Sequence, residues 1–195
     1  MRQCRSAAVS AAALFLFGVN ALAADVEAGR SKAQICTACH GEGGNAANPA
    51  MPSIAGQPAQ AIATQLFQFR AGNRKDPQMS PIAEKLSNAD MNDLAAYFAT
   101  QKMAPPKHQT TPAAAAAGPE QTRKLNCTQC HGPALLGLQH IPRIAGQQPD
   151  YLRVQLRGFK AGTRADMDGN MTAVARLLSD QDIEVLVDYI AGLGS

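Results

Sequence analysis

The sequence Cys-x-x-Cys-His occurs twice in this chain of 195 residues, at 36–40 and again at 127–131. This spacing is the attachment signal of c-type haem. Each thiol can form a thioether with one vinyl group of the haem, and the histidine that follows directly can bind the iron as an axial ligand. We therefore predict two covalent haem groups, with thioethers at Cys36, Cys39, Cys127 and Cys130 and with axial histidines at His40 and His131.

Paired cysteines also serve other purposes. Four cysteines in an exported protein ordinarily predict two disulfides, two Cys-x-x-Cys pairs can bind one zinc ion through four thiolates, and a thioredoxin-like dithiol stands in a strand–helix unit. Disulfides and zinc leave the histidine after each pair unexplained, and no strand–helix pattern surrounds either motif. Covalent haem is the interpretation that explains the cysteines and the histidines together.

Residues 1–23 have the features of a secretory signal peptide. Arg2 and Arg5 precede an apolar stretch from Ala7 to Val19, and Ala21-Leu22-Ala23 fits an A-x-A cleavage site. The apolar stretch is too short to span a bilayer as a mature helix, although a retained N-terminal anchor is the alternative. We predict cleavage after Ala23, which would also remove the fifth cysteine of the sequence.

The predicted mature chain is nearly neutral. The whole sequence has 18 Lys and Arg against 15 Asp and Glu, and removal of Arg2 and Arg5 leaves 16 basic residues. No basic run is interleaved with aromatic residues, so the sequence predicts no nucleic-acid partner. Net charge does not identify a protein partner either.

The two motifs belong to two copies of one unit. Ile54-Ala55-Gly56-Gln57 recurs at 144–147, Phe69-Arg70-Ala71-Gly72 recurs as Phe-Lys-Ala-Gly at 159–162, and the offset stays between 90 and 92 residues up to Tyr97 and Tyr189. We predict a tandem duplication, with a first domain at 24–101, a connector at 102–118 and a second domain at 119–195. Prolines at both ends predict a semi-extended connector, with a helical turn in its five alanines as the alternative.

Each unit has helical periodicity. Apolar residues at 62, 66 and 69 lie on one face of a helix, and residues 152, 156 and 159 repeat that face. Gly72 and Gly162 stand where glycine ends a helix, while Ser87-x-x-Asp90 and Ser179-x-x-Asp182 predict capped starts for the last helices. Short helices are also expected at about 26–35 and 120–125. We predict an all-α fold of two domains.

A second protein ligand would close each haem iron, and methionine is the candidate. Met79 and Met171 each lie seven residues before the leucine that precedes the capping serine, so they occupy equivalent positions in a loop before a helical turn. Thioether ligation raises the haem potential relative to two histidines. Met167 is a rival to Met171, but its position breaks the repeat. Other residues predicted to have no ligand role are Met51, Met91, Met103, His108 and His140.

With its signal peptide, its two Cys-x-x-Cys-His units, its paired methionines and its connector, the chain resembles the cytochrome c4 family. The resemblance covers residues 24–195 and is most specific in the two Ile-Ala-Gly-Gln segments, in Asp76-Pro77-Gln78-Met79 and in residues 178–183. It implies that each half is a class I cytochrome c, in which a proline carbonyl accepts a hydrogen bond from the axial histidine. Pro52 and Pro142 match that position. The second half departs from the first by two extra residues between Arg164 and Met171.

The resemblance also implies a function. Members of the family are periplasmic electron carriers between a quinol-oxidising complex and a terminal oxidase, sometimes loosely bound to the membrane, and their two haems face each other across the domain interface. We therefore expect a di-haem electron carrier in the periplasm rather than an enzyme. The alternatives are a cytochrome subunit of a dehydrogenase, such as a flavocytochrome c, and a di-haem peroxidase, which would need acid–base groups beside an open haem.

Overall fold

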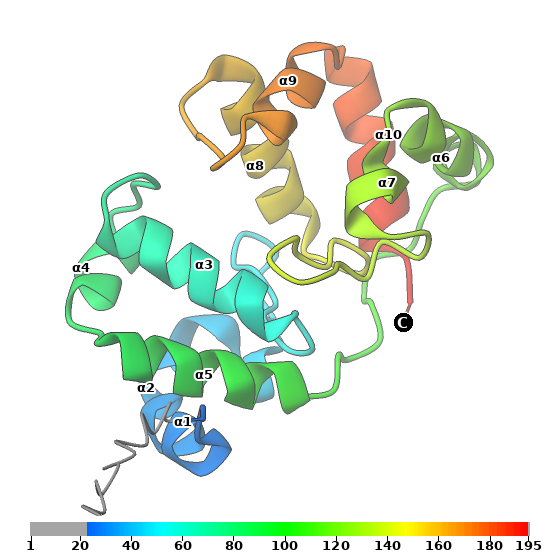
Figure 1. Ribbon diagram of the computed structural model, residues 1–195. Helices are drawn as coiled ribbons and strands as arrows, with labels where there is room; N and C mark the ends of the chain where they lie inside the picture. Colours follow the sequence, from blue (N-terminus) through cyan, green and yellow to red (C-terminus); the bar gives the residue numbers. More distant parts are fainter. Residues whose placement is uncertain (1–22, 195) are drawn as a thin grey trace, which may run out of the picture.

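The computed structural model describes residues 23–194, so the predicted signal peptide lies outside the described residues except for Ala23. Ten α-helices and one short 3-10 helix form in this range and no strand does, although Leu138 and Ile141 make an isolated antiparallel bridge. The predicted all-α class is confirmed, and Figure 1 shows two helical units joined by a stretch of extended chain. Between residues 23 and 194, no helix is long and apolar enough to cross a membrane.

The first unit is built around its last helix. It contains α1 (Val26–Lys32), α2 (Gln34–His40), the 3-10 helix η1 (Glu42–Gly44), α3 (Ala59–Arg70), α4 (Met79–Glu84) and α5 (Asn88–Thr100). Helix α5 packs against α1 and α3, and α4 packs on α3. The buried core comprises Ala33, Ile62, Leu66, Met91, Leu94, Ala95 and Phe98.

The second unit repeats this arrangement. It contains α6 (Pro112–Lys124), α7 (Cys127–His131), α8 (Pro149–Ala161), α9 (Asn170–Arg176) and α10 (Asp180–Ala191). Helix α10 packs against α6 and α8, and α9 packs on α8. Its buried core comprises Leu135, Ala145, Leu152, Leu178, Ile183, Leu186, Val187, Ile190 and Ala191.

A glycine lets the first and last helices of each unit approach closely. A Cβ atom on Gly29 would lie 2.1 Å from the backbone oxygen of Asp93 on α5, and one on Gly118 would lie 2.1 Å from the ring of Tyr189 on α10. Both distances are far below a van der Waals contact, so no side chain fits at either position. The first helix of each unit, which leads into the motif, is therefore held closely against the last helix.

The predicted helix ends are largely confirmed. Ser87 and Ser179 form capping boxes with Asp90 and Asp182, because each serine hydroxyl accepts from the aspartate amide and each carboxylate accepts from the serine amide. Gly162 ends α8 in the left-handed region at φ 73°, and Gly72 follows the end of α3 at the same angle. These local signals fix where the helices beside the predicted haems begin and end.

The predicted connector is free of helix only in its first part. Residues 102–111 contain no helix, but α6 already begins at Pro112, so the prediction of semi-extended chain across 102–118 is wrong for its second part and the helical alternative holds. The hydroxyl of Thr111 accepts from the Ala114 amide at 3.3 Å, and proline suits the first helical position. The five alanines that follow have the highest helix propensity, so they join this start to the predicted helix at 120–125.

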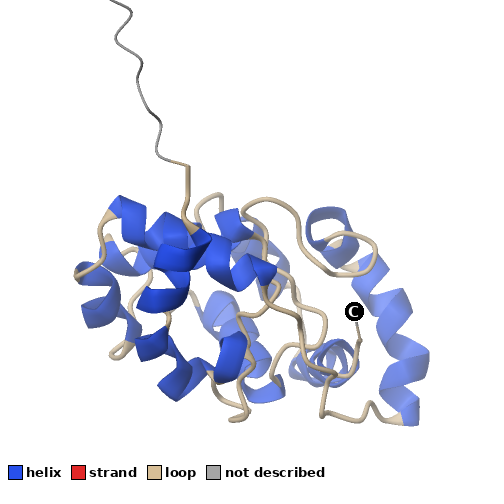
Figure 2. Ribbon diagram, turned by 90° about the horizontal axis from the view of Figure 1, so that it is seen from below, coloured by secondary structure: helices blue, strands red, loops and turns tan. Residues whose placement is uncertain are grey.

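The two units meet through the loops that follow the motifs. The Tyr151 amide at the start of α8 donates to the carbonyl of Pro49 at 3.0 Å, and the side chains of Gln57, Gln147 and Gln148 donate hydrogen bonds to backbone carbonyls of the opposite unit. In Figure 2 loop segments occupy the region between the two helical units. The interface is therefore built largely from side-chain amides bound to backbone.

Candidate haem sites

Each Cys-x-x-Cys-His motif lies on a short helix that ends at its histidine. In α2 the motif takes up the last five residues, and in α7 it forms the whole helix. Helical spacing places the first cysteine, the second cysteine and the histidine on neighbouring parts of one face. Within residues 23–194 no disulfide joins any of the four cysteines, and no cluster of three or more His, Cys, Asp or Glu residues could hold a metal ion. The two pairs therefore do not form one zinc site.

The axial histidine candidates are buried and oriented by proline carbonyls. His40 Nδ1 lies 2.8 Å from the Pro52 carbonyl oxygen, and His131 Nδ1 lies 2.7 Å from that of Pro142. Because a carbonyl only accepts, Nδ1 carries the proton and Nε2 is left as the ligand atom. Burial lowers the pKa of both histidines, against the opposing effect of the proline hydrogen bond, so the rings are neutral at pH 7.

Both methionine candidates are held by an aspartate whose role the sequence analysis did not predict. Asp76 Oδ1 accepts from the Met79 amide at 2.8 Å, and Asp166 Oδ2 accepts from the Met171 amide at 2.7 Å. The two aspartates are 90 residues apart and the two methionines are 92 apart, so the insertion lies between Asp166 and Met171 and leaves this contact intact. The sequence did carry a signal for this contact, because the two aspartates are separated by the 90-residue offset of the repeat.

The methionines occupy the first turns of short helices rather than the loop before them. Met79 is the first residue of α4, where it is partly buried and packs against the core of its unit, and Met171 is the second residue of α9 and is partly buried. The rival Met167 is 69% exposed. Of the two methionines in the second unit, Met171 is thus the one that the fold holds in place.

Two arginines lie between the units without forming an ion pair inside the described chain. Arg74 donates to Gln65, Tyr151 and Gln155, at 2.6, 3.1 and 3.1 Å respectively. Its equivalent Arg164 donates to Gln155 and Gln65, so the two guanidinium groups share both glutamines. Each guanidinium also lies over the phenylalanine of its own unit, 4.4 Å from the ring of Phe69 and 4.3 Å from that of Phe159.

The two guanidinium groups would be stabilised by a nearby anion. Burial lowers the pKa of Arg164 to about 10, and its Nε has no hydrogen-bond partner among residues 23–194. Burial raises the pKa of the half-buried Tyr151, but the charges of Arg74 and Arg164 and their hydrogen bonds outweigh this effect, so the pKa is lowered. The sequence analysis missed the pair, although both arginines follow the Phe-x-Ala-Gly repeat by the same two residues.

A third guanidinium is buried at the centre of the interface. Arg143 is 2% exposed, and it donates to the carbonyls of Ala145 and Ala55, the latter at 3.0 Å. Burial lowers its pKa to about 10. The equivalent residue in the first unit is Ser53, so this cation has no counterpart in the repeat.

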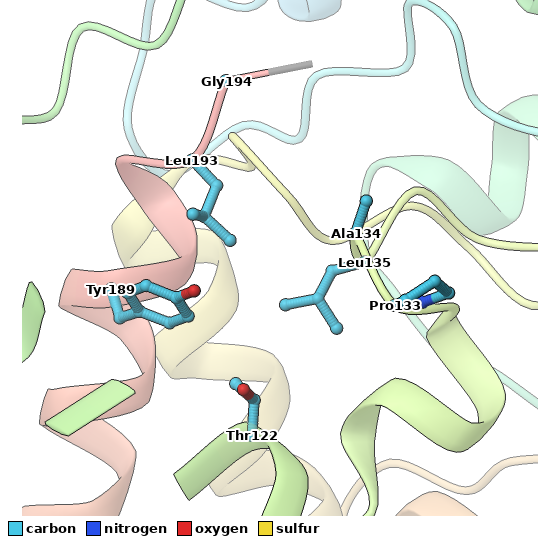
Figure 3. Close-up of a pocket in the computed structure, with 7 residues that line it drawn as sticks. All are labelled: Thr122, Pro133, Ala134, Leu135, Tyr189, Leu193 and Gly194. Carbon is cyan, nitrogen blue, oxygen red and sulfur yellow. The ribbon is translucent and has the colours of Figure 1, made fainter. Parts of the chain in front are cut away.

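The cavity in the second unit and the two histidines outside the motifs are not part of either haem site. The cavity drawn in Figure 3 has a volume of about 160 Å³ and is lined by side chains such as Thr122, Leu135 and Tyr189, with none of the predicted haem residues. His108 is bound to Asp188 through Nε2 at 2.6 Å and His140 is exposed, as suits ordinary polar histidines.

The residues present in each unit fit a covalent haem. A pair of thiols on one helical face, a neutral histidine with its Nε2 left for a metal and a partly buried methionine are the donor set that class I ligation requires. The orphaned Nε of Arg164 and its neighbour Arg74 supply cations for carboxylate groups, and haem carries two propionates. The methionines and the two arginines lie outside the motif that first indicated haem, so they add to its evidence.

Known protein families match both halves of the chain. Residues 24–98 match the family model "Cytochrome C oxidase, cbb3-type, subunit III", and residues 115–194 match the family model "Cytochrome c". The two matches fall on the two helical units and leave the connecting stretch between them.

Curated relatives span almost the whole chain. Cytochrome c4 of Pseudomonas aeruginosa is 36% identical, over 92% of this chain and 94% of the relative. Cytochrome c4 of Thiocapsa roseopersicina is 38% identical, over 87% of this chain and 93% of the relative. A protein of Thiomonas intermedia named thiosulfate dehydrogenase electron acceptor is 35% identical, over 82% and 79%.

Solved structures give the same picture. The crystal structure of reduced cytochrome c4 from Pseudomonas stutzeri superposes with a TM-score of 0.82 at 36% identity and covers 88% of this chain and 100% of its own. The thiosulfate dehydrogenase of Marichromatium purpuratum has a TM-score of 0.76 at 30% identity, covering 87% of this chain but only 40% of its own length.

Proposed function

Because the chain belongs to the cytochrome c4 family of c-type electron carriers with two covalently bound haem c groups, we propose that it carries electrons in the periplasm from a quinol-oxidising complex toward a terminal oxidase. The predicted signal peptide and the family resemblance support the compartment and the partners. The haem supplies reversible one-electron oxidation and reduction at its iron. The chain's own residues attach it, ligate it and shield it from water.

The proposed attachment and ligand residues fall into two equivalent sets. The first haem would be held by Cys36, Cys39, His40 and Met79, and the second by Cys127, Cys130, His131 and Met171. The proline contacts of the two histidines and the aspartate contacts of the two methionines support this assignment, because the repeat preserves all four. We also propose that Arg74 and Arg164 bind haem propionates at the interface.

One observation favours a carrier over an enzyme: besides its buried histidine, each unit offers a methionine that is anchored through its own backbone amide. A haem closed on both faces exchanges electrons at its edge and has no position for a substrate. A di-haem peroxidase would keep one iron open and would place acid–base groups beside it. The carrier is therefore the function we favour.

Carbon monoxide binding tests this closure directly. The reduced full-length holoprotein should bind carbon monoxide negligibly at both haems, and its intact mass should equal that of the mature chain with two haems. Rapid binding at one haem would overturn the closed-iron assignment and favour a peroxidase. In a reconstituted system, a quinol-oxidising complex should reduce the protein and a terminal oxidase should oxidise it.

A second candidate function is that of a cytochrome subunit or dedicated acceptor of a dehydrogenase. It is favoured by the 35% identity to a thiosulfate dehydrogenase electron acceptor and by the match to part of a solved thiosulfate dehydrogenase. Co-purification with a dehydrogenase, haem-containing or flavin-containing, would support it. Isolation as a free haemoprotein, with fast reduction by a quinol-oxidising complex, would favour the general carrier. A weak, small docking interface is expected for the free carrier.

A further inference from the structure

We propose that Gln57 and Gln147 are positioning residues that link the axial histidine of each unit to the opposite unit. The inference rests on the proposed ligation of haem iron by His40 and His131. It concerns hydrogen bonds that cross the interface and that the repeat has preserved in both directions.

The first link runs from Gln147 to His40. Gln147 Oε1 accepts from the Ser53 amide at 2.7 Å, and its Nε2 donates to the Ser53 carbonyl at 2.9 Å. Both residues are buried, at 4% and 6% exposure. The Ser53 amide belongs to the same peptide group as the Pro52 carbonyl, which accepts from His40 Nδ1. One peptide group thus joins the glutamine of the second unit to the histidine of the first.

The second link mirrors the first. Gln57 Oε1 accepts from the Arg143 amide at 2.8 Å, and its Nε2 donates to the Arg143 carbonyl at 2.9 Å. That amide shares a peptide group with the Pro142 carbonyl, which accepts from His131 Nδ1. The side chains at 53 and 143 differ completely, yet the glutamine contacts are the same because they involve only backbone.

The peptide group can transmit the effect of each glutamine to the histidine of the opposite unit. A peptide N–H that donates a hydrogen bond polarises its own carbonyl and makes that oxygen a stronger acceptor. A stronger bond to Nδ1–H makes the histidine a stronger electron donor to its metal. This favours the oxidised iron, so each glutamine lowers the reduction potential of the haem in the opposite unit. Water cannot replace the buried acceptor when the glutamine is removed.

Gln148 shows what a structural role alone would look like. Its Nε2 also crosses the interface, to the Ala46 carbonyl at 2.6 Å and to the Ser53 hydroxyl at 3.5 Å. Its side chain makes no hydrogen bond to the peptide group between Pro52 and Ser53. Gln148→Leu is therefore a matched control: it removes an interfacial amide from the same face without breaking the link to His40.

The test is a redox titration of the full-length holoprotein followed by NMR, which resolves the two haems. Gln147→Leu should raise the potential of the first-unit haem, shifting its reduced-to-oxidised ratio about threefold at a fixed electrode potential, and should leave the second-unit haem unchanged. Gln57→Leu should do the reverse. The His40 Nδ1 proton should move upfield in Gln147→Leu and stay in place in Gln148→Leu.

Two other patterns of potential shifts would overturn the inference. Equal shifts in Gln147→Leu and Gln148→Leu, or a shift confined to the haem of the mutated unit, would reduce the glutamines to structural contacts. Should Gln147→Leu not fold, Gln57→Leu provides the same test in the other direction. In the wild type, fast amide exchange at both Ser53 and Arg143 would also refute the links. Failure here with intact histidine–methionine spectra leaves the proposed carrier function standing.

Discussion

The two units of this protein are most alike at the backbone contacts that hold the proposed ligands and least alike in the side chains between them. The histidine–proline contacts differ by 0.1 Å, and both methionine amides are held by an aspartate despite a two-residue insertion. In contrast, buried Arg143 stands where the first unit has Ser53. The duplication has kept the geometry that ligation demands and has let charge vary nearby.

The largest expected effect comes from removing a methionine. If the units are equivalent, Met79→Ala and Met171→Ala should each lower the potential of their own haem, by on the order of 0.1–0.3 V within the ~0.8 V range that axial ligands cover. Each variant should also abolish the methionine–iron charge-transfer band of that haem. Visible spectroscopy and redox titration measure both effects.

The control for the second unit is its exposed neighbour. Met167→Ala should leave both the spectrum and the potentials unchanged, because Met167 is 69% exposed. A normal spectrum in Met171→Ala together with a loss in Met167→Ala would show that the insertion has moved the ligand. The equivalence of the two units would then fail at this point.

The next effect concerns Arg143, which is part of the second unit but contacts both units. Its guanidinium binds the carbonyls of Ala55 and Ala145, which are equivalent residues. Arg143→Met should therefore lower both potentials, by on the order of tens of millivolts, because a buried cation disfavours the oxidised iron. Arg143→Lys keeps the charge, so both potentials should stay close to their wild-type values. A change at the second haem alone would assign the cation to one unit.

The attachment of the first helix also distinguishes the units. In both, the residue before that helix donates its amide to a carboxylate of the last helix, from Asp25 to Asp93 and from Thr111 to Asp188. The two carboxylates are not equivalent in the repeat: Ala96 stands at the place of Asp188. In the second unit the same carboxylate also binds His108 of the connector.

Removal of this carboxylate should give a pH-dependent loss of stability. Burial raises the pKa of Asp188, but hydrogen bonds from Thr111 and His108 outweigh burial and the pKa is lowered. A lowered pKa stabilises the fold above the unfolded value of about 3.9, and this contribution is lost as the pH falls through the folded value. Asp188→Asn should therefore cost about 1–2 kcal/mol near pH 7, and this cost should fall progressively as the pH drops below the unfolded value of about 3.9.

Denaturant unfolding at several pH values, followed by amide exchange in α6 and α10, measures this effect. The exposed Asp168→Asn serves as the control, since its contacts remain within its own loop. A cost that stays constant down to pH 3 would contradict the assignment of the stabilisation to the charged carboxylate.

The sequence predicts this fold well because its local signals repeat. The motifs, the capping serines and the helix-ending glycines each act through neighbouring residues, so one copy confirms the reading of the other. The alanine run was the exception, since its helix depends on the cap at Thr111. The interface was harder to predict, because Gln57 and Gln147 bind residues 86 and 94 positions away. Their repetition marked them as constrained, but only the fold shows what they bind.

The smallest expected effect tests the equivalence of the last helices. Ser87→Ala and Ser179→Ala should each destabilise their own unit by about 1 kcal/mol, because each removes the acceptor for one aspartate amide, at 3.1 and 3.0 Å. Amide exchange in α5 and α10 of the holoprotein reports each cost separately. Ser31→Ala, which alters an exposed hydroxyl within a helix, should have little effect. The two costs can differ, since Asp90 also pairs with Lys32 whereas Asp182 binds Gln121.

A cost at Ser87 well below that at Ser179 would mean that the ion pair holds the first cap in place without its serine. The capping box, which has the same two residue types in both units, would then contribute differently to their stability.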